Sequence, residues 1–258
     1  MKYYPNNTLT SFVTRLQKTI TLSGDWEVAL SEFQFPRSWY TIKRSGELFT
    51  VKCDDNLSSE EIRNPASNMA ILLPGGYYDT IADIVNEMNS GVRRVVGGLN
   101  KVPESLWPVL KYNESSKRVG IALQRKSAVQ LSENLKLLLG IGTTSLINKT
   151  DGPVSRNGGE VGDVSGGIHG LYVYCDLAES VPVGDTEAPL LRVVSAKGEK
   201  GEMQQRNFDQ LMYIPLQKKH FDSVEIFIRD DLGNPIPFES GKLLVTLHFR
   251  RSKNPYFL

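Results

Sequence analysis

The sequence predicts a mainly β protein, a sandwich or barrel of short strands that carries a small α+β insert of the helix–hairpin–helix kind. At least eight short runs alternate apolar and polar residues, are rich in Val, Ile, Tyr and Phe, and are separated by Gly, Asn, Asp and Pro. In the middle of the chain, two further stretches repeat their apolar residues at helical spacing instead.

The predicted strands are spread over the whole chain. The clearest are the last two, 224–228 and 243–249, in which alternate positions are apolar. Val224, Ile226 and Ile228 are predicted to share one face of the first, and the odd-numbered residues to share one face of the second. In chain order the predicted strands are 12–16, 26–36 with Pro36 ending it, 48–53, 109–112, 118–123, 171–177, 190–194, 213–216, 224–228 and 243–249.

Two predicted helices interrupt this series. Asp79 or Thr80 can cap the first, whose apolar residues recur at i, i+3, i+4 and i+7, and residues 89–91 are predicted to end it. The second spans 132–139 and stops at a glycine. The hairpin of the two strands between them completes an insert of about 75–143.

The strands on both sides of this insert lack enough partners without each other, so the chain is predicted to form a single unit, 1–258. Residues 148–170 contain seven glycines and almost no apolar residue. This composition predicts a flexible surface loop.

Length and charge exclude several classes of protein. A chain of 258 residues can bury a sizeable core. Its 30 basic and 29 acidic residues leave a net charge of +1, whereas nucleic-acid-binding domains usually show a basic excess, so no specific nucleic acid is expected. No apolar run approaches ~18 residues, so no membrane span is expected, and the start lacks the apolar core of a signal peptide. Cys53 and Cys175 are predicted to be buried free thiols in a reducing compartment.

One stretch, 224–249, raises the question of chemistry, because Asp230 and Asp231 are adjacent and His248 follows closely. Leu-Gly-Asn-Pro directly follows the aspartates, and Asp, Gly, Asn and Pro all favour turns. Adjacent residues of a strand also point to opposite faces, so both carboxylates would reach one ion only if the loop bent them together. The turn is the favoured interpretation, and a calcium or acid–base site is the alternative.

No other group of residues predicts catalysis. The histidines His169, His220 and His248 form no H-E-x-x-H pattern, and neither a G-x-S-x-G turn nor a phosphate-binding glycine loop occurs. A histidine in a strand is more often packed or exposed than a general base. A triad whose members meet only in the fold stays open as an alternative, which would make the chain a β-sandwich hydrolase. We expect no catalytic, cofactor-binding or metal-binding residue.

Two further alternatives concern binding. Three Trp, ten Tyr and ten Phe would suit a β-sandwich module that stacks on glycans or binds a receptor, although aromatic residues in strands lie more often in a core or an interface. The chain ends on an apolar tip, Tyr256, Phe257 and Leu258, after a polar segment. This tip is either a tail that docks on a partner or a segment that folds back on its own domain.

Several long blocks of sequence resemble the minor capsid, or penton, proteins of Polinton/Maverick elements and of the related adintoviruses. The blocks keep the order that the family shows and cover most of the chain, whereas segments 93–107 and 148–170 depart from the pattern. The blocks are YYPNNTLTSFVTRL near the start, GDWEVALSEFQFPRSWY at 24–40, LPGGYYDTIADIVNEMN at 73–89, YVYCDLAESVPVGDTEAPLLRVV at 172–194 and VEIFIRDDLGNPIPFESGKLLVTLHFR at 224–250.

The resemblance implies a jelly-roll sandwich that forms homopentamers at capsid vertices and contacts the larger, double-jelly-roll major capsid protein. It implies a structural component of the virion, built inside the host cell, with no catalysis and no cofactor. No single residue takes over a functional role from the family. Some adenoviral pentons carry an Arg-Gly-Asp receptor motif, and this sequence has none.

Overall fold

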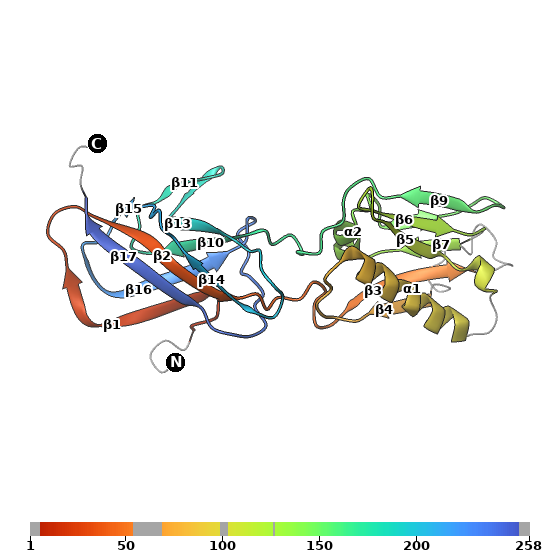
Figure 1. Ribbon diagram of the computed structural model, residues 1–258, viewed down its shortest axis with the longest axis horizontal. Helices are drawn as coiled ribbons and strands as arrows, with labels where there is room; N and C mark the ends of the chain where they lie inside the picture. Colours follow the sequence, from red (N-terminus) through yellow and green to blue (C-terminus); the bar gives the residue numbers. More distant parts are fainter. Residues whose placement is uncertain (1–5, 54–68, 99–102, 126, 253–258) are drawn as a thin grey trace. The chain divides into compact units, whose positions relative to one another are not determined.

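The structure is a computed structural model of the chain, which divides into two compact units (Figure 1). Unit 1 is formed by Met1–Trp39 together with Ile168–Leu258, and unit 2 is the segment between them, Tyr40–Gly167. The predicted insert of about 75–143 therefore lies within unit 2. The residues that the structure describes are 6–53, 69–98, 103–125 and 127–252.

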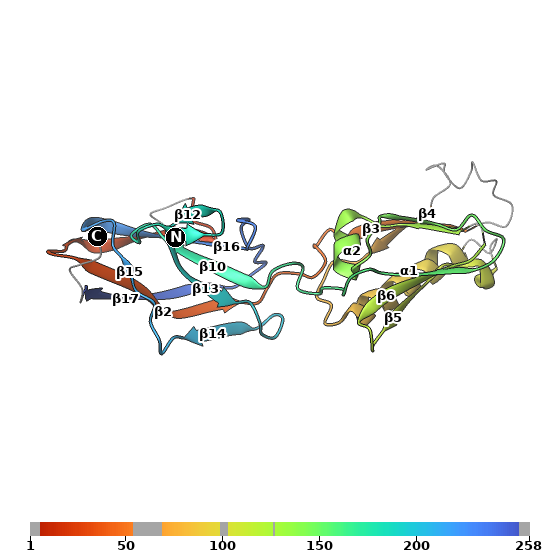
Figure 2. The same ribbon diagram turned by 90° about the horizontal axis from the view of Figure 1, so that it is seen from above.

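Unit 1 contains two antiparallel sheets (Figures 1 and 2). One has the strand order β1-β16-β10-β13. In the other, β17 pairs with one edge of β2, while β14 and β15 pair with successive parts of its other edge. A separate hairpin is formed by β11 and β12. The strands are β1 Ser11–Thr21, β2 Trp26–Pro36, β10 Gly170–Cys175, β11 Val181–Val183, β12 Thr186–Ala188, β13 Leu190–Ser195, β14 Met203–Asn207, β15 Ile214–Pro215, β16 His220–Arg229 and β17 Leu244–Arg251.

The strand pairing of unit 1 is that of a jelly roll. β1 pairs with β16, β2 with β14 and β10 with β13, so these strands form one long hairpin of nested antiparallel pairs. The hairpin is rolled up, because β16 also pairs with β10 and β17 with β2. The mainly β class and the jelly roll are thus confirmed.

Side-chain alternation places the core of unit 1 between its two sheets. Ile226 and Ile228 of β16 are buried, and Leu247 and Phe249 of β17 pack on the same core, so the predicted faces of both strands are confirmed. The two strands do not pair with each other, however. β16 belongs to one sheet and β17 to the other, so the segment between them crosses from sheet to sheet.

Unit 2 consists of two antiparallel sheets and two α-helices (Figure 1). The strand orders are β4-β3-β7-β8 and β5-β6-β9. The predicted hairpin is confirmed as β5 and β6. The elements are β3 Glu47–Cys53, β4 Met69–Leu73, α1 Ile81–Gly98, the 3-10 helix η3 Glu104–Leu106, β5 Val109–Asn113, β6 Arg118–Leu123, β7 Ser127–Gln130, α2 Glu133–Leu139, β8 Ser145–Ile147 and β9 Val154–Asn157.

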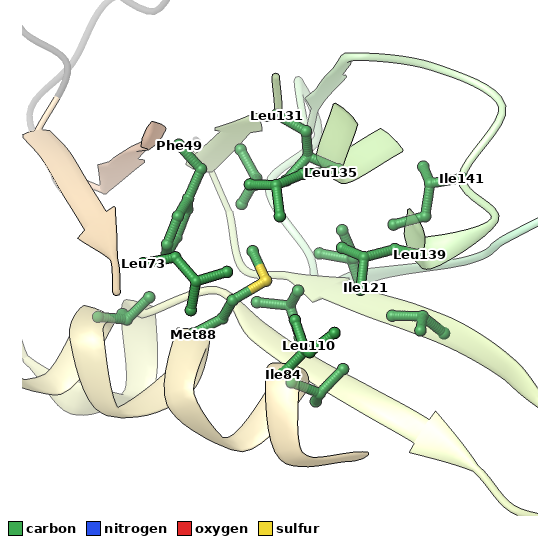
Figure 3. Packing of buried hydrophobic residues seen from close by; sticks show 14 of the residues in the cluster. Phe49, Leu73, Ile84, Met88, Leu110, Ile121, Leu131, Leu135, Leu139 and Ile141 are labelled. Carbon is green, nitrogen blue, oxygen red and sulfur yellow. The ribbon is translucent and has the colours of Figure 1, made fainter. Parts of the chain in front are cut away.

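One core fills the space between the helices and sheets of unit 2 (Figure 3). Met88 of α1 lies among Phe49, Leu73 and Leu110 from three strands, and Leu135 of α2 is buried in the same cluster. The segment 148–170, expected as a flexible glycine-rich loop, contains β9, which pairs with β6. β9 has little apolar content, so sequence alternation does not reveal it.

The first helix is longer than predicted, because it continues through 89–91 to Gly98. Asn89 does not end it. Its side-chain amide instead accepts a hydrogen bond from the N–H of Leu110 (3.0 Å) and donates one to the C=O of the same residue (2.9 Å). Gly91 is needed for close packing, since a Cβ there would lie 2.7 Å from Cγ2 of Ile71.

The second helix agrees with the prediction at both ends. Ser132 is its N-cap and its side chain accepts a hydrogen bond from the N–H of Leu135 at 3.2 Å. Gly140 ends the helix in the left-handed conformation, with φ of 66°.

Candidate functional site

The Asp230–Asp231 pair forms a turn, which is the interpretation that the sequence favoured. Oδ1 of Asp230 accepts hydrogen bonds from the backbone N–H groups of Leu232 (3.0 Å) and Asn234 (2.7 Å). The side-chain amide of Asn234 donates to Oδ2 at 3.2 Å. The carboxylate of Asp230 is therefore occupied by its own loop, and Asp231 is exposed.

The three histidines lie at different places in unit 1. Nδ1 of His248 is 2.9 Å from the hydroxyl of Tyr213, and Nδ1 of His220 is 2.9 Å from Oγ1 of Thr21. The C=O of His169 accepts the N–H of Ala196 at 3.0 Å. Within the described ranges, no three His, Cys, Asp or Glu side chains gather where they could hold a metal ion.

Both cysteines are buried and neither forms a disulfide, as predicted. Burial raises the pKa of the Cys175 thiol from its usual 9.0 to about 11. The thiol of Cys175 is therefore protonated at neutral pH, and a protonated, buried thiol is a poor nucleophile.

A polar network covers the end of the sheet that contains β2 and β17. Nε of Arg250 donates to Glu27 at 2.7 Å, and the hydroxyl of Ser252 donates to the other oxygen of the same carboxylate at 3.1 Å. The guanidinium of Arg250 also lies 3.4 Å from the ring centroid of Tyr213. These contacts join β2, β17 and the segment before β15 at this end of the sheet.

Glu32 organises a second network farther along the same sheet. One of its carboxylate oxygens accepts from the side-chain amides of Gln34 (2.8 Å) and Gln205 (2.7 Å), and the other accepts from the hydroxyl of Thr246 (3.2 Å). Sequence reasoning missed both networks, because their members come from strands far apart in the chain. The one available signal was the polar residues that alternate with apolar ones along 26–36 and 244–251.

Unit 2 has a pocket of about 510 Å³ between β8 and β9. Two of its lining residues are cations, Lys149 and Arg156, and none is a carboxylate or a histidine. The pocket thus has no general base, and its cations and hydroxyls suit a small anionic or hydroxyl-rich ligand. The lining residues are Thr143, Ser145, Leu146, Ile147, Asn148, Lys149, Thr150, Val154 and Arg156.

Buried Asn148 holds the wall of this pocket in place. Its side-chain amide donates to the C=O groups of Leu123 (3.2 Å), Gln124 (2.9 Å) and Gly152 (2.8 Å). Its Oδ1 accepts from the N–H and the hydroxyl of Thr150. The asparagine is therefore a structural residue and is not available to a ligand.

Two other expectations concern a docking tail and a membrane span. The apolar tip Tyr256, Phe257 and Leu258 lies outside the described residues. No helix in the described part of the chain is long and apolar enough to cross a membrane.

No protein-family model and no curated protein matches this sequence. The solved structures that are similar to the chain include the following two. The first is the crystal structure of the mavirus penton protein, with 11% identity, a TM-score of 0.49, and coverage of 94% of this chain and 91% of that one. The second is a structure of the Sputnik virophage from cryo-electron microscopy, with 10% identity, a TM-score of 0.43, and coverage of 93% and 91%. The assignment of the jelly roll rests on the strand pairing described above.

Proposed function

We propose that this chain is a structural protein of a virion, a penton-like minor capsid protein that forms pentamers at the capsid vertices. Its second partner would be the major capsid protein of the same shell. The observation that carries the proposal is the jelly-roll pairing of unit 1, an architecture common in viral capsid proteins. The sequence blocks that resemble Polinton and adintovirus pentons support the same assignment and suggest that kind of element as the source.

A ring of five needs two different surfaces on each subunit, which meet head to tail and close. A jelly roll offers such surfaces at its sheet edges and end loops. We expect each contact between subunits to bury more than ~1,000 Å², the lower range for a stable biological interface. We also propose that the chain acts as one capsid subunit, in which the insert and the 148–170 segment add surface to the jelly roll.

Light scattering and electron microscopy of the purified protein test this proposal. We expect a particle with five times the 28.8 kDa of the chain, seen as a five-fold ring. If the pure protein stays monomeric, assembly should be repeated with a major capsid protein from the same source. A monomer that neither self-assembles nor binds that protein would rule out the penton role.

The alternative is a module that binds glycans or a receptor, and the pocket with Lys149 and Arg156 favours it. Under this alternative, the chain would bind anionic glycans on an array as a monomer. Arg156→Ser would remove the signal, and Lys111→Ser, at an exposed position on β5, would leave it unchanged.

A further inference from the structure

β1 is an edge strand, because among the described residues it pairs only with β16. The N–H of Ile228 donates to the C=O of Thr10 at 2.8 Å, which fixes the direction of the backbone groups along this antiparallel pair. Accordingly, the even-numbered residues at the start of β1 turn their backbone groups toward β16, whereas Ser11 and Val13 turn theirs away from the sheet. An edge with open backbone groups is a template for pairing with a strand of another molecule.

The side chain of Asn7 bonds to both outward groups of Val13. Its Oδ1 accepts the N–H of Val13 at 2.9 Å, and its Nδ2 donates to the C=O of Val13 at 3.0 Å. A carboxamide has a donor and an acceptor like those of a backbone peptide group, so these are the two hydrogen bonds that one residue of a neighbouring strand would form. Asn7 thus takes the place of a partner strand opposite Val13.

Thr8 does the same for Ser11, the preceding outward residue. The N–H of Ser11 donates to Oγ1 of Thr8 at 3.0 Å, and the C=O of Ser11 accepts the N–H of Thr8 at 2.7 Å. All four outward backbone groups of Ser11 and Val13 are therefore bonded to two adjacent residues that precede the strand. We call Asn7 and Thr8 the edge cap.

The second half of β1 resists pairing for a different reason. Its register with β16 shifts between Arg15 and Ile20, and Arg15 and Lys18 are exposed. An irregular backbone and exposed charges both disfavour the addition of a strand. The regular part of β1, 11–15, is the part that begins at the edge cap. It carries Phe12 and Val13 and a single charge, a composition that would favour pairing if the edge were open.

The same arrangement recurs in unit 2. β5 is also an edge strand, since within the described ranges it pairs with β6 alone. The side chain of Asn89 on α1 accepts the N–H of Leu110 at 3.0 Å and donates to the C=O of Leu110 at 2.9 Å. In each unit, therefore, an asparagine side chain from another segment closes both backbone groups of one residue on a sheet edge.

We propose that the edge cap keeps β1 from pairing with the β1 strand of another copy of this chain. With the cap in place, a second strand must displace Asn7 and Thr8 before it can bond to Ser11 and Val13. Without the cap, two copies would join through these outward groups as an antiparallel pair of β1 strands. The inference does not depend on the penton role, because it compares assembly with and without the cap.

Two substitutions remove the polar atoms of the cap and keep the side chains close to their original size. Asn7→Leu combined with Thr8→Val is this uncapped variant. The matched control is Asn6→Leu combined with Thr186→Val, which introduces the same side chains at two exposed positions. Neither Asn6 nor Thr186 makes a side-chain hydrogen bond within the described residues. Association caused only by added apolar surface would therefore appear in the control as well.

Amide hydrogen exchange, resolved to single residues by mass spectrometry with gas-phase fragmentation, tests whether the cap forms. In dilute solution, we expect the amides of Ser11 and Val13 to exchange at least ~10-fold faster in the uncapped variant than in the unchanged protein. The amides of Phe12 and Thr14, which face β16, should keep their rates, and the control should match the unchanged protein. Equal exchange of Ser11 and Val13 with and without the cap would overturn the proposal.

Sedimentation velocity over a range of concentrations tests whether the cap prevents pairing. We expect the uncapped variant to form species larger than the unchanged protein does, in proportions that grow with concentration, while the control sediments like the unchanged protein. In the larger species, the amides of Ser11 and Val13 should regain protection, because they bond to a second β1.

Three outcomes of the sedimentation experiment would contradict the proposal. The uncapped variant sediments like the unchanged protein at every concentration, it associates without protecting the amides of Ser11 and Val13, or the control associates equally. The unchanged protein is the reference in each comparison, whatever its own state of assembly. A failure here is therefore distinct from a failure to form pentamers.

Discussion

Asp230 accepts two backbone N–H groups of the loop that it begins, and this loop carries the chain from one sheet of the jelly roll to the other. Asp230 therefore stabilises the backbone conformation of this connecting loop. Asn148 and Asn89 act in a similar way, since their side chains bond to backbone groups of other segments. At the scale of single residues, these three polar side chains hold loops and strand edges.

Replacing Asp230 by alanine tests this role. Asp230→Ala leaves the N–H groups of Leu232 and Asn234 without their acceptor, so we expect a loss of about 0.5–2 kcal/mol in the free energy of unfolding. Asp231→Ala is the matched control and should change it by less than about 0.5 kcal/mol, because that side chain is exposed. Urea denaturation followed by circular dichroism measures both. Equal effects of the two variants would contradict the structural role of Asp230.

The Cys175 thiol predicts a dependence of stability on pH. Its pKa is about 11 in the folded protein, against a usual 9.0, so the folded state holds this proton more tightly than the unfolded state does. The contribution of this protonated thiol to the free energy of unfolding is fully present below about pH 9 and is lost as the pH rises toward 11. We expect the free energy of unfolding to fall by about 1–3 kcal/mol over this range because of the thiol.

Cys175→Ala isolates this effect. The substitution should lower stability at pH 7 but should flatten the decline above pH 9, and denaturation curves at a series of pH values measure the slope. Burial also raises the pKa of Tyr174, so some decline above pH 10 should persist in the variant. An identical pH slope in both proteins would show that the Cys175 thiol is not shielded as described.

The helices show how the same residue types act differently within an element. Gly140 ends α2, where a left-handed conformation is needed, whereas Gly91 lies inside α1 and lets it approach Ile71. Asn89 sits mid-helix because its side chain bonds to the backbone of Leu110. Local propensity predicted both helices, and tertiary packing decided where the first one ends.

Gly140→Ala should destabilise unit 2 by about 1–3 kcal/mol, since a left-handed φ is strained for alanine. An added Cβ would also lie 2.5 Å from the C=O oxygen of Glu160. Gly142→Ala, two residues further on, meets nothing within 4 Å and is the matched control. Thermal unfolding of both variants provides the comparison. A Gly140→Ala protein as stable as the control would show that residue 140 does not lie this close to the backbone of Glu160.

At the scale of the whole molecule, the chain has two separate hydrophobic cores. One consists of residues of unit 2, such as Leu135, and the other of residues of unit 1, such as Leu171. Each core joins segments that are distant in sequence. The two segments that form unit 1 are separated in sequence by the roughly 128 residues of unit 2. Contacts between residues so far apart in the chain form slowly, so we expect unit 1 to fold more slowly than unit 2.

Two cores predict two unfolding transitions in calorimetry. Leu135→Ala should lower the free energy of unfolding of unit 2 by about 2–5 kcal/mol, because this side chain is fully buried. Leu171→Ala should lower that of unit 1 by a similar amount for the same reason. Each substitution should therefore move only the transition of its own unit to a lower temperature. Trp107 of unit 2 and Trp26 of unit 1 can report on the units separately, after the other tryptophans are replaced by phenylalanine. If either leucine substitution lowers both transitions equally, the units unfold as one.

The sequence by itself determined the local features of this protein. Alternation in 224–228 and 243–249 predicted two strands and their buried faces, Ser132 and Gly140 predicted the limits of a helix, and Asp230 with its neighbours predicted a turn. Each of these depends on residues within a few positions of one another. The tertiary structure decided the pairing of β16 and β17 with different sheets, the length of α1, and the Glu27 and Glu32 networks. These depend on contacts between residues up to 200 or more positions apart, such as Glu27 and Arg250, and periodicity along one segment carries no information about its distant partner.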